Sequence, residues 1–185
     1  MSDKKRKDGL HRLTVCALFA AMICAVSPIA IPIGPVPISL GLLGVLLCAV
    51  CLPPLMSLTA VTVYVAIGLC GLPVFSGAMG GVPALAGPTG GYLWSYLLLT
   101  PTVSLLCRGR GKTLPPTLLR AFFACLFGLL VCYCFGVLQL ALITKTPILS
   151  AIGVGALPFL PIDLCKALLA AAVGRRLSVL LARRI

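Results

Sequence analysis

The chain has 185 residues, of which 61% are hydrophobic and 10% charged, and its formal net charge is +12. A soluble domain of this length carries about a quarter charged residues, so the composition indicates a membrane protein and excludes a sizeable soluble domain. The charge does not indicate a nucleic-acid partner, because it is not gathered on one folded face. Instead, 13 of the 15 Lys and Arg residues lie in three clusters that flank hydrophobic segments. These are Lys4, Lys5, Arg6, Lys7 and Arg12; Arg108, Arg110, Lys112 and Arg120; and Arg175, Arg176, Arg183 and Arg184.

Residues 1–12 are expected to form a basic cytoplasmic tail, because they lead into an apolar stretch without a clear signal-peptide cleavage site. Residues 13–182 are then expected to form a single membrane domain of six spans. The spans are predicted at about Leu13–Ala30, Ile38–Leu52, Leu55–Cys70, Gly90 to just before Arg108, Leu118–Ile143 and Ile152–Leu177. The second and third are short for a hydrocarbon core of about 30 Å, so we expect them to be tilted, broken or partly shielded.

The basic clusters predict the orientation of these spans. Six spans with a cytoplasmic N-terminus place all three clusters inside, as the positive-inside rule requires, whereas five spans would expose one cluster. The link over residues 28–39, the loop over residues 71–91 and the link near Lys145 then lie outside. The sequence therefore predicts an all-α, multi-pass bundle in the cell membrane, with both termini in the cytoplasm.

Catalytic and metal-binding chemistry has no candidate residues. The chain has ten cysteines, most of them within apolar runs, but a single histidine and no two CxxC motifs, so a zinc site lacks a ligand set. His11 lies in the tail, no Ser or Cys has a plausible base beside it, and no phosphate-binding P-loop occurs. We expect no enzyme activity, metal or cofactor, and ATP-driven transport would need a separate chain.

The loop over residues 71–91 is the first candidate ligand site. With Tyr92 it contains seven glycines and three prolines, GLPVFSGAMGGVPALAGPTGGY, between segments hydrophobic enough to span a bilayer. Such non-helical backbone survives near a membrane only where protein covers it or a cavity solvates it. The loop stays apolar, unlike most solvated connectors, so we favour an inward-packing loop over an ordinary external connector.

Asp163 and Lys166 are the second candidate, as the only ionisable residues deep within a span. Their i,i+3 spacing places them on one face of the last helix, and buried charges of this kind face a bundle interior or cavity. They could form a self-neutralising pair that fixes helix packing, or a polar pair presented to a small ligand, and the residues alone leave both open. Pro158 and Pro161 predict a kink just before the pair.

The start of the fourth span, GPTGG at residues 87–91, is a third candidate. Pro88 suits a helix start, and the amides of the following Thr89, Gly90 and Gly91 could bind a carboxylate at the positive end of the helix dipole. Tyr92 and Thr89 add hydroxyl groups; the alternative is a well-capped helix and nothing more. In the first span, Ala17 and Ala21 form a small-xxx-small pattern that lets another helix approach closely.

Taken together, the motifs resemble BioY, the biotin-specific substrate-binding (S) component of energy-coupling factor (ECF) transporters. The resemblance is carried by PIGPVPISL (32–40), GLPVFSGAMGG followed by GPTGGY (71–92), YCFGVLQLAL (133–142) and LPFLPIDLCKALLA (157–170). It implies a six-helix bundle in a bacterial cell membrane that captures biotin near the outer face. It also implies that Ala17 and Ala21 dock a shared transmembrane (T) component coupled to two ATPases.

The resemblance further implies a ligand site formed by both outer loops and by the fourth to sixth helices. Its expected members are Pro37, Ser39, Phe75, Ser76, Pro88, Thr89, Gly90, Gly91, Tyr92, Asp163 and Lys166. Asp163 would accept from the ureido N–H groups of biotin, and either Lys166 or the start of the fourth helix would bind the carboxylate. The chain departs from the family at Gly41, where a Gln is frequent, and at Gly77–Ala78, where a polar residue is frequent.

Three other functions remain open at this point. The chain could be an S component for another small vitamin, or a stand-alone secondary transporter with Asp163 as a proton relay. It could also be a structural membrane subunit that binds no ligand.

Overall fold

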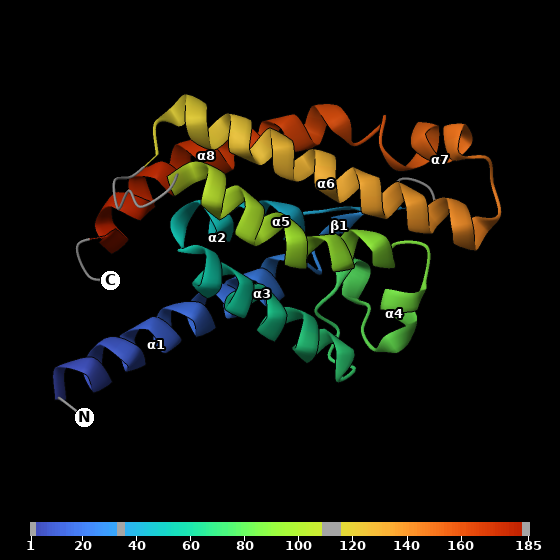
Figure 1. Ribbon diagram of the computed structural model, residues 1–185. Coiled ribbons are helices and arrows are strands. Elements are labelled where there is room, and N and C mark those ends of the chain that lie inside the picture. Colours follow the sequence, from blue (N-terminus) through green and yellow to red (C-terminus); the bar gives the residue numbers. More distant parts are fainter. Residues whose placement is uncertain (1–2, 33–35, 109–115, 183–185) are drawn as a thin grey trace.

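The computed structural model describes residues 3–32, 36–108 and 116–182 and is mainly helical (Figure 1). Within these ranges the helices are α1 Asp3–Val26, α2 Gly41–Cys51, α3 Pro54–Leu69, α4 Val82–Ala86, α5 Gly90–Arg108, α6 Leu118–Thr144, α7 Ile148–Gly155 and α8 Leu160–Ala182. A 3₁₀ turn, η1 Ser76–Ala78, precedes α4, and strands β1 Ala30–Ile31 and β2 Ile38–Ser39 pair antiparallel. The all-α fold class is therefore confirmed, with a two-residue ribbon inside the first predicted loop.

Four of the predicted spans agree with α2, α3, α5 and α6 to within three residues at each end. The first differs, because α1 starts at Asp3 and the predicted tail is helical from that residue onward. The last predicted span is divided into α7 and α8, which meet at a bend of 56°. Pro158 lies in the turn between them and Pro161 in the first turn of α8, where a missing N–H costs no helix bond. The predicted kink is confirmed.

By length and composition, α1 and α6 could each cross a membrane, and the bent α7–α8 pair could form a third span. The six-span count remains a prediction. The 11 residues of α2 extend only about 16 Å, half of a hydrocarbon core. Nine of these residues are buried. The sequence predicts that a short span is tilted, broken or shielded, and α2 is shielded by the neighbouring helices.

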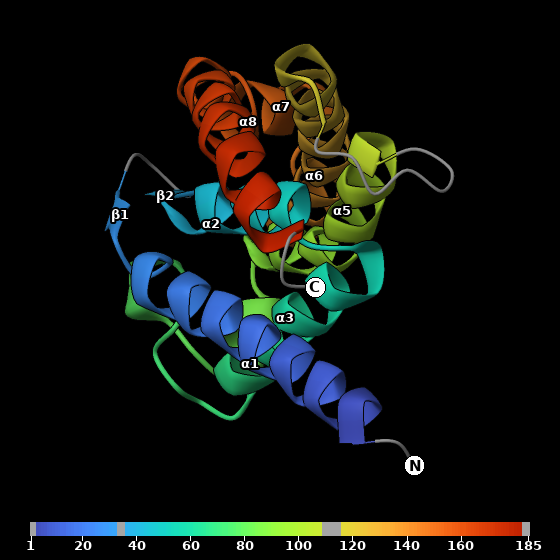
Figure 2. The same cartoon turned by 90° about the vertical axis from the view of Figure 1, so that its left-hand side faces the viewer.

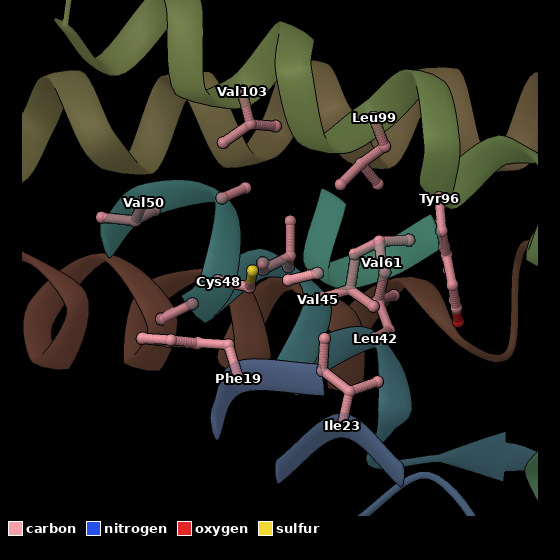
Figure 3. Packing of buried hydrophobic residues seen from close by; sticks show 14 of the residues in the cluster. Phe19, Ile23, Leu42, Val45, Cys48, Val50, Val61, Tyr96, Leu99 and Val103 are labelled. Carbon is pink, nitrogen blue, oxygen red and sulfur yellow. The ribbon is translucent and has the colours of Figure 1, made fainter. Parts of the chain in front are cut away.

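The main hydrophobic core surrounds α2. This helix packs against α8, α5 and α1, while α5 and α6 pack along each other. In Figure 3, Val45 and Cys48 of α2 lie between Ile23 of α1 and Leu99 and Val103 of α5. Large aliphatic and aromatic side chains also cover the outside of α1, α6 and α8, as expected of helices that contact lipid.

The molecule has two ends of different character. The N-terminal part of α1, the C-terminal end of α5, the start of α6 and the C-terminal part of α8 lie at one end (Figure 1). The described basic residues Arg108, Arg120, Arg175 and Arg176 belong to these segments. Arg110, Lys112, Arg183 and Arg184 lie outside the described residues. α4 and α7 lie at the opposite end, and the β1–β2 ribbon lies between the two ends (Figure 1). We call the first end the terminal end and the opposite one the loop end.

Candidate ligand-binding site

One cavity lies toward the loop end, where the two predicted outer loops meet α5, α6 and the α7–α8 junction. Its volume is about 70 Å³, measured as the space that the centre of a water molecule can occupy. It is lined by Val36, Pro37, Ile38, Ser39, Leu42, Phe75, Ser76, Met79, Ala84, Thr89, Tyr92, Leu93, Tyr96, Cys132, Tyr133, Gly155, Phe159, Asp163 and Lys166. Most of this lining is apolar, and a few polar groups converge within it, as is typical of a site for a compact organic ligand.

The structure brings eight of the eleven predicted site residues to this cavity: Pro37, Ser39, Phe75, Ser76, Thr89, Tyr92, Asp163 and Lys166. Pro88, Gly90 and Gly91 do not line it. The first predicted loop, residues 28–39, contributes Val36, Pro37, Ile38 and Ser39 to the lining. Residues 33–35 of this loop lie outside the described residues.

Asp163 and Lys166 form an ion pair on the wall of the cavity. Lys166 Nζ lies 2.8 Å from Asp163 Oδ1 and donates a second hydrogen bond, also of 2.8 Å, to the Ser39 carbonyl of β2. The other carboxylate oxygen, Asp163 Oδ2, accepts from the Tyr133 hydroxyl at 2.7 Å. Both charged residues are buried, Asp163 being 5% and Lys166 7% exposed. The pair is self-neutralising and also lines the cavity, so its geometry is compatible with both readings that the sequence leaves open.

The bend before α8 positions this pair. The chain turns at residues 156–159, and Asp163 then lies in the first turn of α8, where the helix dipole favours a carboxylate. The Tyr92 hydroxyl donates to the carbonyl of Gly155 at the end of α7, at 2.7 Å. This bond joins α5 to the end of α7. It therefore connects the two sides of the cavity that Tyr92 and Gly155 line.

The glycine-rich loop is anchored by Phe75, which is fully buried and packs edge-on against Tyr64 with ring centroids 5.5 Å apart. The ring lies over Gly68 of α3, so close that a Cβ on Gly68 would overlap it. Gly77 and Gly81 adopt φ of 70° and 79°, which L side chains rarely do, and the Gly81 amide donates to the Gly68 carbonyl. The prediction of an inward-packing loop is confirmed in part: Phe75 and Leu85 are buried, whereas Leu72, Met79 and Val82 are exposed. Part of the loop is helical, as α4 and η1 show.

Ser76, next to this anchor, presents a free hydroxyl to the cavity. Its Oγ is buried and makes no hydrogen bond within the described part of the chain. Buried hydroxyls are normally paired, so an unpaired one in a cavity wall is a natural partner for a ligand atom.

The start of α5 differs from the expected open cluster of amides. The Gly90 amide donates to the Gly87 carbonyl and the Tyr92 amide to the Thr89 carbonyl. Gln139 Nε2 donates to the carbonyls of Leu85 and Gly87 at 2.8 Å each, which ties α6 to the turn. Gly90 and Gly91 are needed for close packing, because a Cβ on either would overlap the backbone of Leu85 or Phe135. This segment builds the wall rather than opening into the cavity.

Sequence reasoning missed several lining residues, above all Tyr133. A buried carboxylate next to one lysine still has a free oxygen, and a tyrosine in a neighbouring span was the available donor. The departure at Gly41 also has a structural basis: a Cβ there would overlap Ser27 Oγ, and the Gly41 amide bonds Ser39 Oγ at 2.9 Å. Position 41 is not part of the cavity lining.

Ala17 and Ala21 lie on α1, which contributes no residue to the lining of the cavity. Both are exposed, on the side of α1 that other helices of the chain leave uncovered. The structure therefore leaves them accessible to another chain.

The helices thus form a bundle with a cavity toward the loop end, and a buried ion pair lies in the wall of that cavity. This fold is that of the S components of ECF-type transporters. A solved structure, the "S-component for biotin from an ECF-type ABC transporter", matches with a TM-score of 0.85 and 29% identity, over 96% of this chain and 94% of that one. The BioY family model matches residues 1–183. The chain belongs to the BioY family.

Two relatives show how far the similarity extends. "Biotin transporter BioY2" of Lactococcus lactis subsp. cremoris is 37% identical over 89% of this chain and 88% of its own length. "Biotin transporter BioY" of Thermotoga maritima is 35% identical over 92% of this chain and 98% of its own. The members of this family are transporter components, so the expectation that the chain is not an enzyme is confirmed.

Proposed function

We propose that this protein is the biotin-binding S component of an ECF vitamin uptake transporter. The observation that carries the proposal is the buried Asp163–Lys166 pair in the wall of an otherwise apolar cavity, in a chain of the BioY family. Biotin combines a ureido ring, an apolar sulfur ring and a carboxylate, so it suits a cavity of mixed character.

The ureido ring is the part of biotin that best suits the ion pair. Lys166 uses two of its three N–H donors on Asp163 and Ser39, and Asp163 keeps lone pairs beyond its two bonds. The pair thus offers an acceptor beside a donor with no net charge. A ureido edge presents the complementary N–H and C=O, so Asp163 would accept the N–H and Lys166 would donate to the carbonyl.

The carboxylate of biotin is then bound elsewhere. Lys166 Nζ is only 2.8 Å from Asp163, whereas the ureido ring and carboxylate lie at opposite ends of biotin. The Gly90 amide is bonded within the chain, and Pro88, Gly90 and Gly91 do not line the cavity, so we leave these three residues out of the ligand contacts. The hydroxyls of Ser76 and Thr89 are the polar groups proposed to face the carboxylate. Phe75, Tyr96 and Leu42 would contact the sulfur ring.

The remaining parts of the proposal concern assembly and orientation. The exposed face of α1 with Ala17 and Ala21 would dock a transmembrane component that is driven by two ATPases. The terminal end, which carries the basic residues, would face the cytoplasm of a bacterial cell, and the loop end would capture biotin from outside.

The test uses the full-length chain purified in detergent. Isothermal titration should give a Kd of about 1 µM or tighter for biotin, with biotin amide retaining most of that affinity because its ureido ring is intact. No heat with biotin would contradict the proposal, and riboflavin or thiamin found bound by mass spectrometry would indicate another vitamin. Biotin uptake by the chain alone that a protonophore abolishes, but ATP depletion does not, would indicate a secondary transporter.

A further inference from the structure

A groove at the terminal end is separate from the ligand cavity. It lies between the first residue of α6 and the C-terminal turns of α8, and its volume is about 360 Å³ by the same measure as the cavity. Its lining consists of Leu118, Ala172, Arg175, Arg176 and Val179. Figure 2 looks onto this end of the molecule, where α6 and α8 lie side by side.

The groove carries two positive charges that no described side chain neutralises. Residues 172, 175, 176 and 179 recur at helical spacing, so Arg175 and Arg176 share one face of α8 with the apolar lining. Neither arginine forms an ion pair among the side chains that the structure describes. The whole sequence has three acidic residues, and Asp163 is held by Lys166 toward the loop end.

Apolar side chains bracket the arginines along the helix. Val173 is 45% and Leu180 61% exposed, so aliphatic surface precedes and follows the guanidinium groups. Charged residues between exposed aliphatic ones belong at the edge of the hydrocarbon layer, where long side chains reach toward the lipid phosphates. A guanidinium group can also bind a phosphate through two parallel hydrogen bonds.

We propose that this groove binds the headgroup of an anionic phospholipid. Arg175 and Arg176 hold the phosphate, and one acyl chain lies against Leu118 and Val179. Basic pockets between membrane helices suit such headgroups, because the apolar wall and the charge select an amphipathic anion. The site does not depend on the identity of the vitamin.

The experiment places the full chain in nanodiscs of phosphatidylcholine with or without phosphatidylglycerol. Phosphatidylglycerol should raise the melting temperature and remain bound in native mass spectra. The double variant R175Q/R176Q should weaken its retention by about tenfold or more, since each basic residue near an anionic surface contributes roughly a fivefold factor. The control R6Q/R12Q removes the same charge from exposed positions of α1 and should keep the lipid.

Two further arms make the result decisive. Ala172→Phe fills the groove without changing charge and should also reduce lipid retention, which covers the case that R175Q/R176Q does not fold. Inorganic phosphate at millimolar concentration should give no comparable stabilisation. Equal losses in R175Q/R176Q and R6Q/R12Q, or full retention in Ala172→Phe, would overturn the proposal. So would unchanged lipid retention in R175Q/R176Q with loss of the co-purifying transporter subunits, which would make the groove a protein contact.

Discussion

At the scale of residues, the site consists of a few polar atoms that satisfy one another almost completely. Asp163 is bonded through both carboxylate oxygens, to Lys166 and Tyr133, and Lys166 ties the same unit to β2. Removing one member of a buried ion pair leaves the other charge uncompensated, so a substitution here acts on stability as well as on binding. The two effects need separate measurements.

We expect Asp163→Asn to lower the affinity for biotin by roughly 1–3 kcal/mol, the size of a lost charge-assisted hydrogen bond. Isothermal titration measures this loss, and the melting temperature reports the cost of leaving Lys166 without its carboxylate. The double variant Asp163→Asn/Lys166→Gln removes both charges and should recover much of the melting temperature but not the affinity. If Asp163→Asn binds biotin as well as wild type and is only less stable, the pair serves packing alone.

Tyr133→Phe should weaken biotin binding too, because Asp163 Oδ2 loses its donor and the carboxylate is held less firmly. A hydrogen bond to a charged group contributes about 1.5–3 kcal/mol, so the affinity loss should not exceed that range. The matched control is Tyr64→Phe, whose hydroxyl bonds Ser27 and does not line the cavity. It should reduce stability and leave biotin affinity unchanged. Equal affinity losses in the two variants would refute a site role for Tyr133.

At the scale of elements, the cavity exists because the glycine-rich loop is pinned to α3. Phe75 fills the space over Gly68, and the amide of Gly81 bonds the Gly68 carbonyl at 2.7 Å. Close packing of this kind tolerates little added volume, because neighbouring groups relax only in part. The loop position is therefore sensitive to a single methyl group on α3.

Gly68→Ala should displace Phe75 and the loop, at a cost of about 1–3 kcal/mol in unfolding free energy and with weaker biotin binding. Chemical denaturation and titration measure the two effects. Gly153→Ala is the control, since its added Cβ meets nothing within 4 Å and α7 gains helix propensity. If Gly68→Ala behaves like Gly153→Ala, the loop is not held by this contact.

The helices could be predicted from the sequence more completely than the site. Hydrophobic runs and prolines located α2, α3, α5 and α6, and the bend before α8, because these depend on local composition. The Lys166 partner of Asp163 could be predicted from its i,i+3 spacing, but the Tyr133 partner could not, since Tyr133 lies in another helix and its contact depends on how α6 packs against α8. The internal bond of the Gly90 amide could not be predicted for the same reason, because its partner, the Gly87 carbonyl, lies in a turn that composition does not specify.

At the scale of the whole molecule, charge and cavity are at opposite ends. Arg108, Arg120, Arg175 and Arg176 belong to the helix segments at the terminal end. The cavity is lined by residues of segments that lie toward the loop end. An excess of Arg and Lys marks the cytoplasmic side of membrane proteins. One orientation therefore satisfies both the charge distribution and the proposed loading of a vitamin from outside.

An epitope tag at the C-terminus and another inserted after Lys145 test this orientation. Lys145 is exposed and ends α6 in a left-handed turn, a place where insertions are tolerated. In intact spheroplasts, antibody should bind the tag at Lys145 and reach the C-terminal tag only after the membrane is permeabilised. Biotin binding by each tagged protein verifies that it is folded. The reverse accessibility would invert the molecule and place the cavity mouth inside. Accessibility of both tags without permeabilisation would require an even number of spans between them. Since only the bent α7–α8 pair separates the two tags, this experiment also decides whether that pair crosses the membrane as one span.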